Sequence, residues 1–184
     1  MAVEQLSLEL AWQSWTTLRV GRFRLPHGET VTRDIEDHGW AASVLPFDPV
    51  RRTVVMVRQF RAAAFVSAGV EETLEAIAGI LDAPDAASEI AREAREEAGL
   101  TLADLQQVGK AWVSPGISTE RATLFLATYT RPDGPAEWST EPGVTALELP
   151  IATLAADLDA GRIGDLKTLA LAQALRLRRP ALFD

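Results

Sequence analysis

The 184-residue sequence contains no cysteine and only two histidines, His27 and His38. Without thiols the chain cannot form disulfides, thiolate zinc sites or a cysteine nucleophile, and the reducing cytoplasm is its expected location. Two histidines in loop-like segments are too few to build a metal site, so we assign them no role. Thiol and histidine-metal chemistry are therefore excluded from the functions considered.

Basic residues and long apolar runs are also scarce. The chain has 18 Lys and Arg against 26 Asp and Glu, and its formal net charge of -8 repels nucleic-acid backbones. The basic cluster at 176–179 ends a predicted helix, where cations favour the negative end of the helix dipole. The first ten residues include Glu4 and Glu9 but no basic leader or long apolar run, so we expect neither a secretory signal nor a membrane span.

The composition and residue order predict one α/β (α+β) domain with its own core. Hydrophobic residues make up 47% of the chain and charged residues 24%. Strand-forming residues predict strands at 15–23, 31–35, 40–47, 53–60, 110–113, 122–130 and 144–149. Helices are predicted after residue 85 and at 151–160 and 166–178, and a Pro/Gly-rich loop at 131–143. Helices packed on a mixed sheet fit this order, with the early strands as a small dimerising subdomain.

The helix after residue 85 carries the main functional signal. Its apolar residues recur at helical spacing, with Asp85 placed to cap its start and Gly99 to end it. Its glutamates crowd into a sector of roughly 100° on one side, at Glu89, Glu93, Glu96 and Glu97. Like charges at i, i+4 cost roughly 0.2–0.5 kcal/mol per pair, which a hard divalent cation would offset. Considered alone, such a helix is more typical of a solvated face.

The residues around this helix resemble the signature of the Nudix hydrolases. Residues 92–99 read Arg-Glu-Ala-Arg-Glu-Glu-Ala-Gly, which matches the family's Arg-Glu-x-x-Glu-Glu-x-Gly, and Gly79 stands in the loop half. Asp85 occupies the place of a glutamate, and six residues rather than the usual seven separate it from Arg92. The resemblance implies a Nudix-type α/β/α sandwich around a mixed sheet. It predicts an N-terminal β-rich segment at 1–40, dimerising, and a Nudix domain at 41–184.

Further segments are similar to the nucleoside-diphosphate-sugar branch of that family, which includes ADP-ribose pyrophosphatases and GDP-mannose hydrolases. They are 54–61, 75–82 and 114–120, and the short box with Ala-Gly-Ile-Leu-Asp is closer to the GDP-mannose type. The resemblance implies hydrolysis of a nucleoside diphosphate sugar to a nucleoside monophosphate and a sugar phosphate. It also implies substrate contacts at Arg58, Arg61, Ser114, Gly116 and Glu120. Alone, the 58–61 motif is typical of an edge-strand cation pair.

The resemblance also implies the ligands of a magnesium site, with manganese as a substitute. These are the backbone carbonyl of Ala78 and the carboxylates of Glu93 and Glu97, with Glu96 sharing or supporting the cluster. Bound metal would neutralise the diphosphate and lower the pKa of a bound water. Arg92 is expected to hold the box in shape through i, i+4 or loop contacts.

The general base is expected in the loop before residue 144. Alignment on Leu149-Pro150 puts Pro142 at the expected carboxylate position, so we favour Glu141, with Glu137, Glu120 and Glu96 as alternatives. The displaced glutamate also keeps open a second function, a Nudix-shaped module that binds a nucleotide sugar without cleaving it. A third interpretation is a structural domain with a solvated acidic helix.

The expected partners are a small nucleotide sugar and a second copy of the chain in a homodimer. Adenine and guanine are distinguished by a few hydrogen bonds from positions without a recognisable motif, so ADP-ribose and GDP-mannose are not separated by sequence. Three of the five tryptophans, Trp12, Trp15 and Trp40, lie in the strand-rich front half. Core or dimer packing is the preferred interpretation for them, with base stacking as the alternative.

Overall fold

The computed structural model describes residues 2–81, 85–131 and 133–184, except the side chain of Glu141. The chain folds into two compact units, Met1–Trp40 with Ala111–Arg121, and Ala41–Lys110 with Ala122–Asp184. In the described part of the chain, no helix has the length and apolar character needed to cross a membrane.

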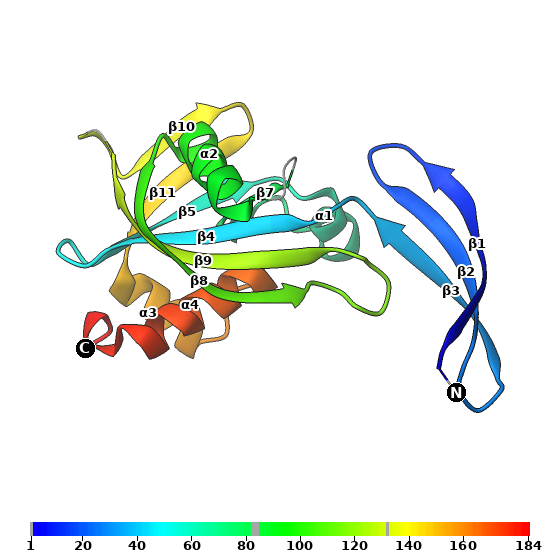
Figure 1. Cartoon of the computed structure of the whole chain (residues 1–184). Helices are drawn as coiled ribbons and strands as arrows, with labels where there is room; N and C mark the ends of the chain where they lie inside the picture. Colours follow the sequence, from blue (N-terminus) through cyan, green and yellow to red (C-terminus); the bar gives the residue numbers. More distant parts are fainter. Residues whose placement is uncertain (1, 82–84, 132) are drawn as a thin grey trace. The chain divides into compact units, whose positions relative to one another are not determined.

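The first unit is built on a three-stranded antiparallel sheet in the order β1 (Glu4–Gln13), β2 (Thr17–Arg24), β3 (Thr30–Asp37) (Figure 1). The segment Ala111–Arg121 completes this unit from far along the chain. Its backbone joins the end of β3, where Glu36 N–H donates to the Ile117 carbonyl at 2.8 Å and the Glu36 carbonyl accepts from Thr119 N–H at 3.0 Å. The unit is therefore stabilised by non-local pairing.

The second unit contains an eight-stranded mixed sheet. The strands of its main path follow the order β10-β11-β5-β4-β9-β8, with β6 beside β5 and β7 beside β4. Their bounds are β4 (Ala41–Asp48), β5 (Thr53–Gln59), β6 (Thr73–Glu75), β7 (Ile77–Ile80), β8 (Thr101–Trp112), β9 (Arg121–Thr130), β10 (Glu137–Glu141) and β11 (Val144–Pro150). β4 and β9 pair in parallel, whereas β5 pairs antiparallel with β4 and β11.

Helices cover both faces of this sheet, which confirms the predicted sandwich. They are α1 (Ala62–Ala68), α2 (Ala86–Ala98), α3 (Ile151–Asp159) and α4 (Leu166–Arg178), followed by the 3-10 turn η1 (Pro180–Leu182). Figure 1 shows α2 on one face of the sheet, and α3 and α4 on the other. The three layers give α2 a fixed support along its apolar side.

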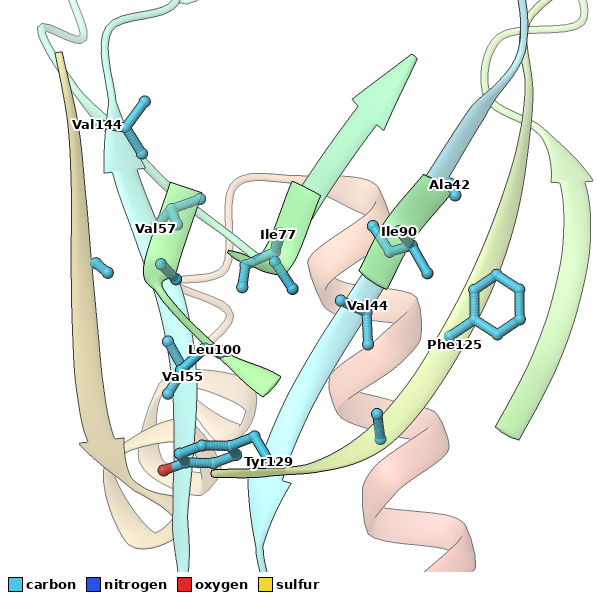
Figure 2. Close-up of a cluster of buried hydrophobic side chains, with 14 residues drawn as sticks. Ala42, Val44, Val55, Val57, Ile77, Ile90, Leu100, Phe125, Tyr129 and Val144 are labelled. Carbon is cyan, nitrogen blue, oxygen red and sulfur yellow. The ribbon is translucent and has the colours of Figure 1, made fainter. Parts of the chain in front are cut away.

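Two apolar clusters fill the two spaces between the layers. Alternate residues of β4 and β5 point to opposite faces, as expected for strands. Val44, Val55 and Val57 pack with Ile77 and Ile90 on the α2 side, where Figure 2 shows them. The neighbouring strand residues pack on the α3 and α4 side with Leu154, Leu171 and Leu175, at Leu45, Phe47, Val54 and Met56. Burial of the apolar stripe of α2 leaves its acidic side outward.

Some predicted elements are wrong in type or extent. The predicted loop 131–143 contains β10, and the predicted strand 110–113 is the end of the longer β8. Asp104 in β8 has φ 49°, a left-handed conformation that breaks the alternation on which strand prediction depends. β1 was not predicted, although Leu6, Leu8, Leu10 and Trp12 recur at the two-residue period of a strand.

Asp165 caps the N-terminus of α4, a helix that packs on the sheet. Its carboxylate caps the helix by accepting from Thr168 N–H at 2.8 Å and Oγ1 at 2.6 Å, and it contacts Lys167 Nζ at 2.9 Å. Burial opposes its ionisation, but the contacts with Thr168 and Lys167 outweigh burial and place its pKa below the ordinary 3.8. The capped form is therefore the ionised one.

We predict that Asp165→Ala lowers the free energy of unfolding by about 1–2 kcal/mol at neutral pH. A depressed folded-state pKa gives stabilisation that is complete above the ordinary pKa and is lost as the pH falls through the folded value. The gap between wild type and variant in urea denaturation should therefore narrow below about pH 4. The exposed control Asp159→Ala, which removes an ion pair with Arg176, should change stability by less than about 1 kcal/mol. A gap independent of pH would contradict the role of the charge.

Candidate active site

The helix α2 has the ends that the sequence predicted. Asp85 accepts from Ala87 N–H at 3.2 Å, and Gly99 follows the last turn with φ 61°, donating to the Arg95 carbonyl at 3.0 Å. A left-handed residue at this position favours glycine because it lacks a Cβ. Within the helix, Ile90, Ala94 and Ala98 are buried against the sheet. These contacts fix which way the glutamates face.

The acidic side of α2 is organised around Arg92. Its guanidinium contacts the carboxylates of Glu93 at 2.5 Å, Glu96 at 2.5 Å and Glu89 at 3.1 Å. The hydrogen bond with Glu89 and the charges of Glu93 and Glu96 raise the pKa of Arg92 above its ordinary value. Arg92 thus makes the i, i+4 contact expected of it, although one cation faces three carboxylates.

The glutamates differ in their access to solvent. Glu97 is buried at 8% exposure, whereas the side chain of Glu93 is 16% exposed and that of Glu96 is 54% exposed. Glu93 and Glu97 lie one turn apart on the same helix face. The Glu89 side chain is as shielded as that of Glu93, at 15% exposed, so exposure alone does not select the predicted metal ligands Glu93 and Glu97. It does place Glu96 at the solvent edge of the acidic side.

Gly79 of β7 makes room for Glu93. A Cβ built on Gly79 would overlap with Cγ and Cδ of Glu93, so only a glycine allows this carboxylate to lie against the strand. Ala78, whose carbonyl is the third predicted ligand, immediately precedes it in β7 and pairs with Ser43 of β4. The glycine of the signature is thus required by a side-chain contact with the helix.

This arrangement fits a hard divalent cation. Carboxylate and carbonyl oxygens are the ligands that Mg²⁺ prefers, and the Gly79 cradle holds Glu93 beside the strand that carries Ala78. Among the described residues, no three acidic or histidine side chains already converge at ligand distances. Arg92 contacts the Oε1 oxygen of Glu93 at 2.5 Å, so a metal ion would bind Glu93 beside this ion pair or displace it.

Arg61 lies in the field of several carboxylates beside the acidic helix. Its Nε and Nη2 each donate to a different oxygen of Glu75 at 2.8 Å, and Glu75 is 3% exposed. Burial favours the neutral acid, but Arg61 and Thr73 outweigh it and lower the pKa of Glu75. The hydrogen bond with Glu75, supported by the charges of Glu97 and Asp165, raises the pKa of Arg61. Arg61, which is predicted to contact the substrate, is therefore held by the buried carboxylate of Glu75.

Arg58 lies on β5, which has β11 and β4 on either side. Its guanidinium contacts Glu72 at 3.2 Å and Glu137 at 2.6 Å. The alternative interpretation of the 58–61 motif placed its cations on an edge strand. This placement is wrong for Arg58, because β5 is an inner strand of the sheet. Glu137, an alternative general base, is engaged by this contact.

The other predicted substrate residues belong to the first unit. The Ser114 carbonyl accepts backbone hydrogen bonds from Ile117 and Ser118 in a turn that contains Gly116. Glu120, another alternative base, lies 3.4 Å from His38 Nε2. Ser114, Gly116 and Glu120 are thus parts of the unit that holds the N-terminal sheet, whereas α2 belongs to the second unit.

The first unit contains a hollow of 780 Å³ next to this turn. Arg121 stacks on Trp112 at 4.6 Å and on Trp40 at 5.8 Å, measured to the ring centres. The lining also includes Arg33, Asp34, Phe23 and Gly116. Aromatic faces beside charged hydrogen-bonding groups can hold a flat polar heterocycle. Trp40 therefore lines a hollow, a location that favours the base-stacking alternative for this tryptophan.

The favoured base, Glu141, ends β10 and pairs with Val144 across the turn formed by Pro142 and Gly143. Its side chain lies outside the described part of the chain. Gly143 has φ 82°, and a proline followed by a left-handed glycine is the pair that a type II turn favours. Turn geometry thus explains why Pro142 occupies the position where the carboxylate was expected.

Comparisons with known proteins find relatives of this chain and a structure of similar fold. A GDP-mannose pyrophosphatase of Yersinia pestis is 34% identical over 181 residues, which cover 93% of this chain and 90% of the relative. An ADP-ribose pyrophosphatase of Escherichia coli O6:H1 is 36% identical over 130 residues, covering 67% of this chain and 62% of the relative. A crystal structure of an ADP compounds hydrolase, at 15% identity, superposes with a TM-score of 0.79 over 98% of this chain and 96% of that chain. No family model matches the chain.

The fold is that of the Nudix hydrolases, as the structural likeness shows. The GDP-mannose pyrophosphatase is 34% identical over almost the whole length of the chain, and the ADP-ribose pyrophosphatase is 36% identical over two thirds of it. The chain therefore belongs to this enzyme family, in its nucleoside-diphosphate-sugar branch. Members of the family generally use a divalent metal ion.

Sequence reasoning missed two groups at this site. Trp138 and Thr140 of β10 donate to backbone carbonyls of α2, and Glu75 holds Arg61. Residues 137–141 contain one apolar residue, Trp138, so their sequence gives little signal for a strand, and prolines and glycines surround them. No local signal identifies the partner of Arg61.

We predict that Gly79→Ala removes metal binding while the fold persists. The new methyl group would displace the flexible Glu93 side chain rather than backbone, so calorimetry should show Mn²⁺ affinity reduced at least about tenfold, with an unchanged circular dichroism spectrum. The matched control is Gly109→Ala in β8, where a Cβ meets no atom within 4 Å. Equal metal affinity in the two variants would contradict the cradle.

Proposed function

We propose that this protein hydrolyses the pyrophosphate bond of a nucleoside diphosphate sugar in a magnesium-dependent reaction, with manganese as a substitute. The observation that carries the proposal is the position of the Glu93 side chain against Gly79, with Glu97 buried one turn further along the same face of α2. The named activities of the relatives, on GDP-mannose and ADP-ribose, support the substrate class. The products would be a nucleoside monophosphate and a sugar phosphate.

Different residues of the chain have different roles in the proposed reaction. A phosphoanhydride is shielded from water by its negative oxygens, so catalysis requires charge neutralisation, a positioned water and removal of a proton. Glu93, Glu97 and the Ala78 carbonyl would hold magnesium, which when bound neutralises the diphosphate and acidifies water. Arg61, held by Glu75 with 43% of its side chain exposed, would contact a diphosphate oxygen.

Glu141 is the proposed general base, which accepts the proton of the attacking water. Water forms a bond to one phosphorus atom, the bridging phosphorus–oxygen bond breaks, and the water's proton passes to the Glu141 carboxylate. The support for Glu141 is its place at the end of β10, a strand that hydrogen-bonds to the metal-binding helix. Glu137 and Glu96 are less suited because Arg58 and Arg92 engage them.

The hollow of the first unit is by itself a candidate site for a nucleobase. Trp40, Trp112 and Arg121 offer surfaces on which a base could stack, and Asp34 and Arg33 offer a hydrogen-bond acceptor and donors.

We predict release of monophosphate from one of ADP-ribose, GDP-mannose and other nucleotide sugars in the presence of Mg²⁺, abolished by chelator. Glu93→Gln should lower kcat by at least about a thousandfold, because the neutral amide is a poor magnesium ligand. The control Glu71→Gln, an exposed change in the same unit, should behave as wild type. Absence of turnover across the panel, with tight binding of one sugar, would instead support a non-catalytic binding module.

A homodimer through β1 completes the proposal. β1 is the edge of its sheet, and it exposes 43% of Leu8 and 60% of Leu10. These leucines lie opposite Gly21 and Arg19 of β2, so they share one face. An exposed apolar edge strand is a site for pairing or aggregation unless another surface covers it. A second copy is the proposed cover.

Light scattering should give wild type the mass of two 19.9 kDa chains. Leu8→Glu combined with Leu10→Glu should give one chain, because each change places a charge in the apolar contact. Glu9→Gln, on the opposite face of the same strand, should remain dimeric. A wild-type monomer, or a double variant that stays dimeric, would refute this interface.

A further inference from the structure

The chain changes its pairing partner between β6 and β7. β6 pairs with β5 as far as Glu75, and β7 pairs with β4 from Ile77 onward. In the described part of the chain, Ala76 belongs to neither ladder, and it is fully buried between the two strands. A buried backbone N–H outside a ladder needs a partner from another part of the fold.

A threonine of α4 provides this partner. Thr168 Oγ1 accepts from Ala76 N–H at 2.7 Å, and both residues are fully buried. The same hydroxyl donates to the Asp165 carboxylate at 2.6 Å. A hydroxyl has one hydrogen to donate and an ionised carboxylate can only accept, so the bond to Asp165 directs the lone pairs of Thr168 toward Ala76. The cap of α4 and the support of the crossover are therefore one chain of hydrogen bonds.

The crossover is also held by its neighbours on both sides of the sheet. Ser43 Oγ of β4, which is fully buried, donates to the Ile77 carbonyl at 2.9 Å. Ala76 packs in the apolar cluster on the α3 and α4 side, and Ile77 packs in the cluster on the α2 side. Figure 1 shows α4 on the face of the sheet opposite α2. Thr168 thus supports the crossover from the face away from the acidic helix.

Glu75, the residue before this crossover, holds Arg61. Its two carboxylate oxygens accept from Arg61 Nε and Nη2, each at 2.8 Å, and one of them also accepts from Thr73 Oγ1 at 2.5 Å. The peptide unit that carries the Ala76 N–H begins at Glu75, and its planarity couples the two backbones. A shift of the Ala76 N–H would therefore move the carboxylate that orients Arg61.

We infer that Thr168 is a positioning residue, which fixes Glu75 and through it the Arg61 guanidinium that contacts the substrate diphosphate. The inference rests on the proposed function, because Arg61 contacts a diphosphate only under that proposal. It adds a residue of α4 that acts on substrate binding from the opposite face of the sheet. It also gives Asp165, which orients the Thr168 hydroxyl, a role beyond the stability of its helix.

Steady-state kinetics on the best substrate of the panel test this role. Thr168→Val keeps the size of the side chain but removes the hydroxyl. It should raise KM by about 5-fold to 20-fold with kcat changed less than about threefold, because the charge that Arg61 contacts is present in both substrate and transition state. Thr168→Ser should return KM to within about twofold of wild type, because it restores the hydroxyl.

Thr53→Val is the matched control in the same unit. It also removes a threonine hydroxyl from a hydrogen bond, at 2.8 Å from the Tyr129 hydroxyl. It should lower the melting temperature, as Thr168→Val does, but leave KM and kcat at the values of wild type. A rise in KM as large as that of Thr168→Val would overturn the inference, because lost stability would then explain both.

A double-mutant cycle tests whether Thr168 acts through Glu75. In a Glu75→Gln background, Thr168→Val should raise KM less than about twofold further, because the bidentate hold on Arg61 is already weakened. A further rise as large as in the wild-type background would overturn the inference. Hydrogen exchange supplies a readout independent of turnover: the Ala76 amide should exchange faster in Thr168→Val, and at the wild-type rate in Thr168→Ser.

The outcomes separate the two proposals. If wild type has no turnover across the panel, the proposed function fails, and the positioning role fails with it. If wild type is active and Thr168→Val keeps the wild-type KM, only the positioning role is overturned. Should Thr168→Val not fold, Asp165→Asn decides instead: it weakens the acceptor that orients Thr168 and should raise KM by about twofold to fivefold, and an unchanged KM would overturn the role.

Discussion

The crowding of negative charge on one side of α2 is the constraint on which the active site depends. Four carboxylates share about a third of the helix circumference, and Arg92 contacts three of them. Like charges at this spacing destabilise an isolated helix. The helix persists because Ile90, Ala94 and Ala98 are buried in the sandwich, and because its two ends are capped. Apolar packing thus allows an arrangement that electrostatics alone would oppose.

Several elements around α2 support its carboxylates. β7 presents a position without a side chain at Gly79, and β10 donates to the carbonyls at the end of the helix. The bidentate pair of Arg61 and Glu75 adds a cation near Glu97. A carboxylate cluster therefore has rigid neighbours on its strand side and a compensating charge close by. Such support is what a site needs if its ligands are to keep their geometry when substrate charge arrives.

Features determined by local sequence were predictable. The period of apolar residues, Asp85 and Gly99 defined α2, and the β-branched and apolar residues of β5 defined a strand. The resemblance of the 92–99 box led to the family and the sandwich fold, and the resemblance of segments 54–61, 75–82 and 114–120 led to the substrate class. Each of these signals lies within a few residues of the element that it describes.

Features that depend on distant partners were not predictable. β10 has only five residues among prolines and glycines, and its hydrogen bonds go to α2, some 44 residues away for Thr140. Arg61 and Glu75 are separated by 14 residues, and no residue next to either one in the sequence predicts that they form an ion pair. Gly79 was recognisable as a motif glycine. The need for glycine there, which comes from the adjacent Glu93 side chain, becomes apparent only from the packing of β7 on α2.

The completion of the first unit by Ala111–Arg121 affects how the chain folds as it is synthesised. β1, β2 and β3 leave the ribosome early, yet the backbone partners of Glu36 are Ile117 and Thr119, about 80 residues later. Domains that wait for distant segments keep apolar surface and strand edges exposed for longer. The nascent N-terminal sheet therefore lacks its last backbone partners until residues 111–121 are made, and slower translation before residue 111 would lengthen the exposure of its edge.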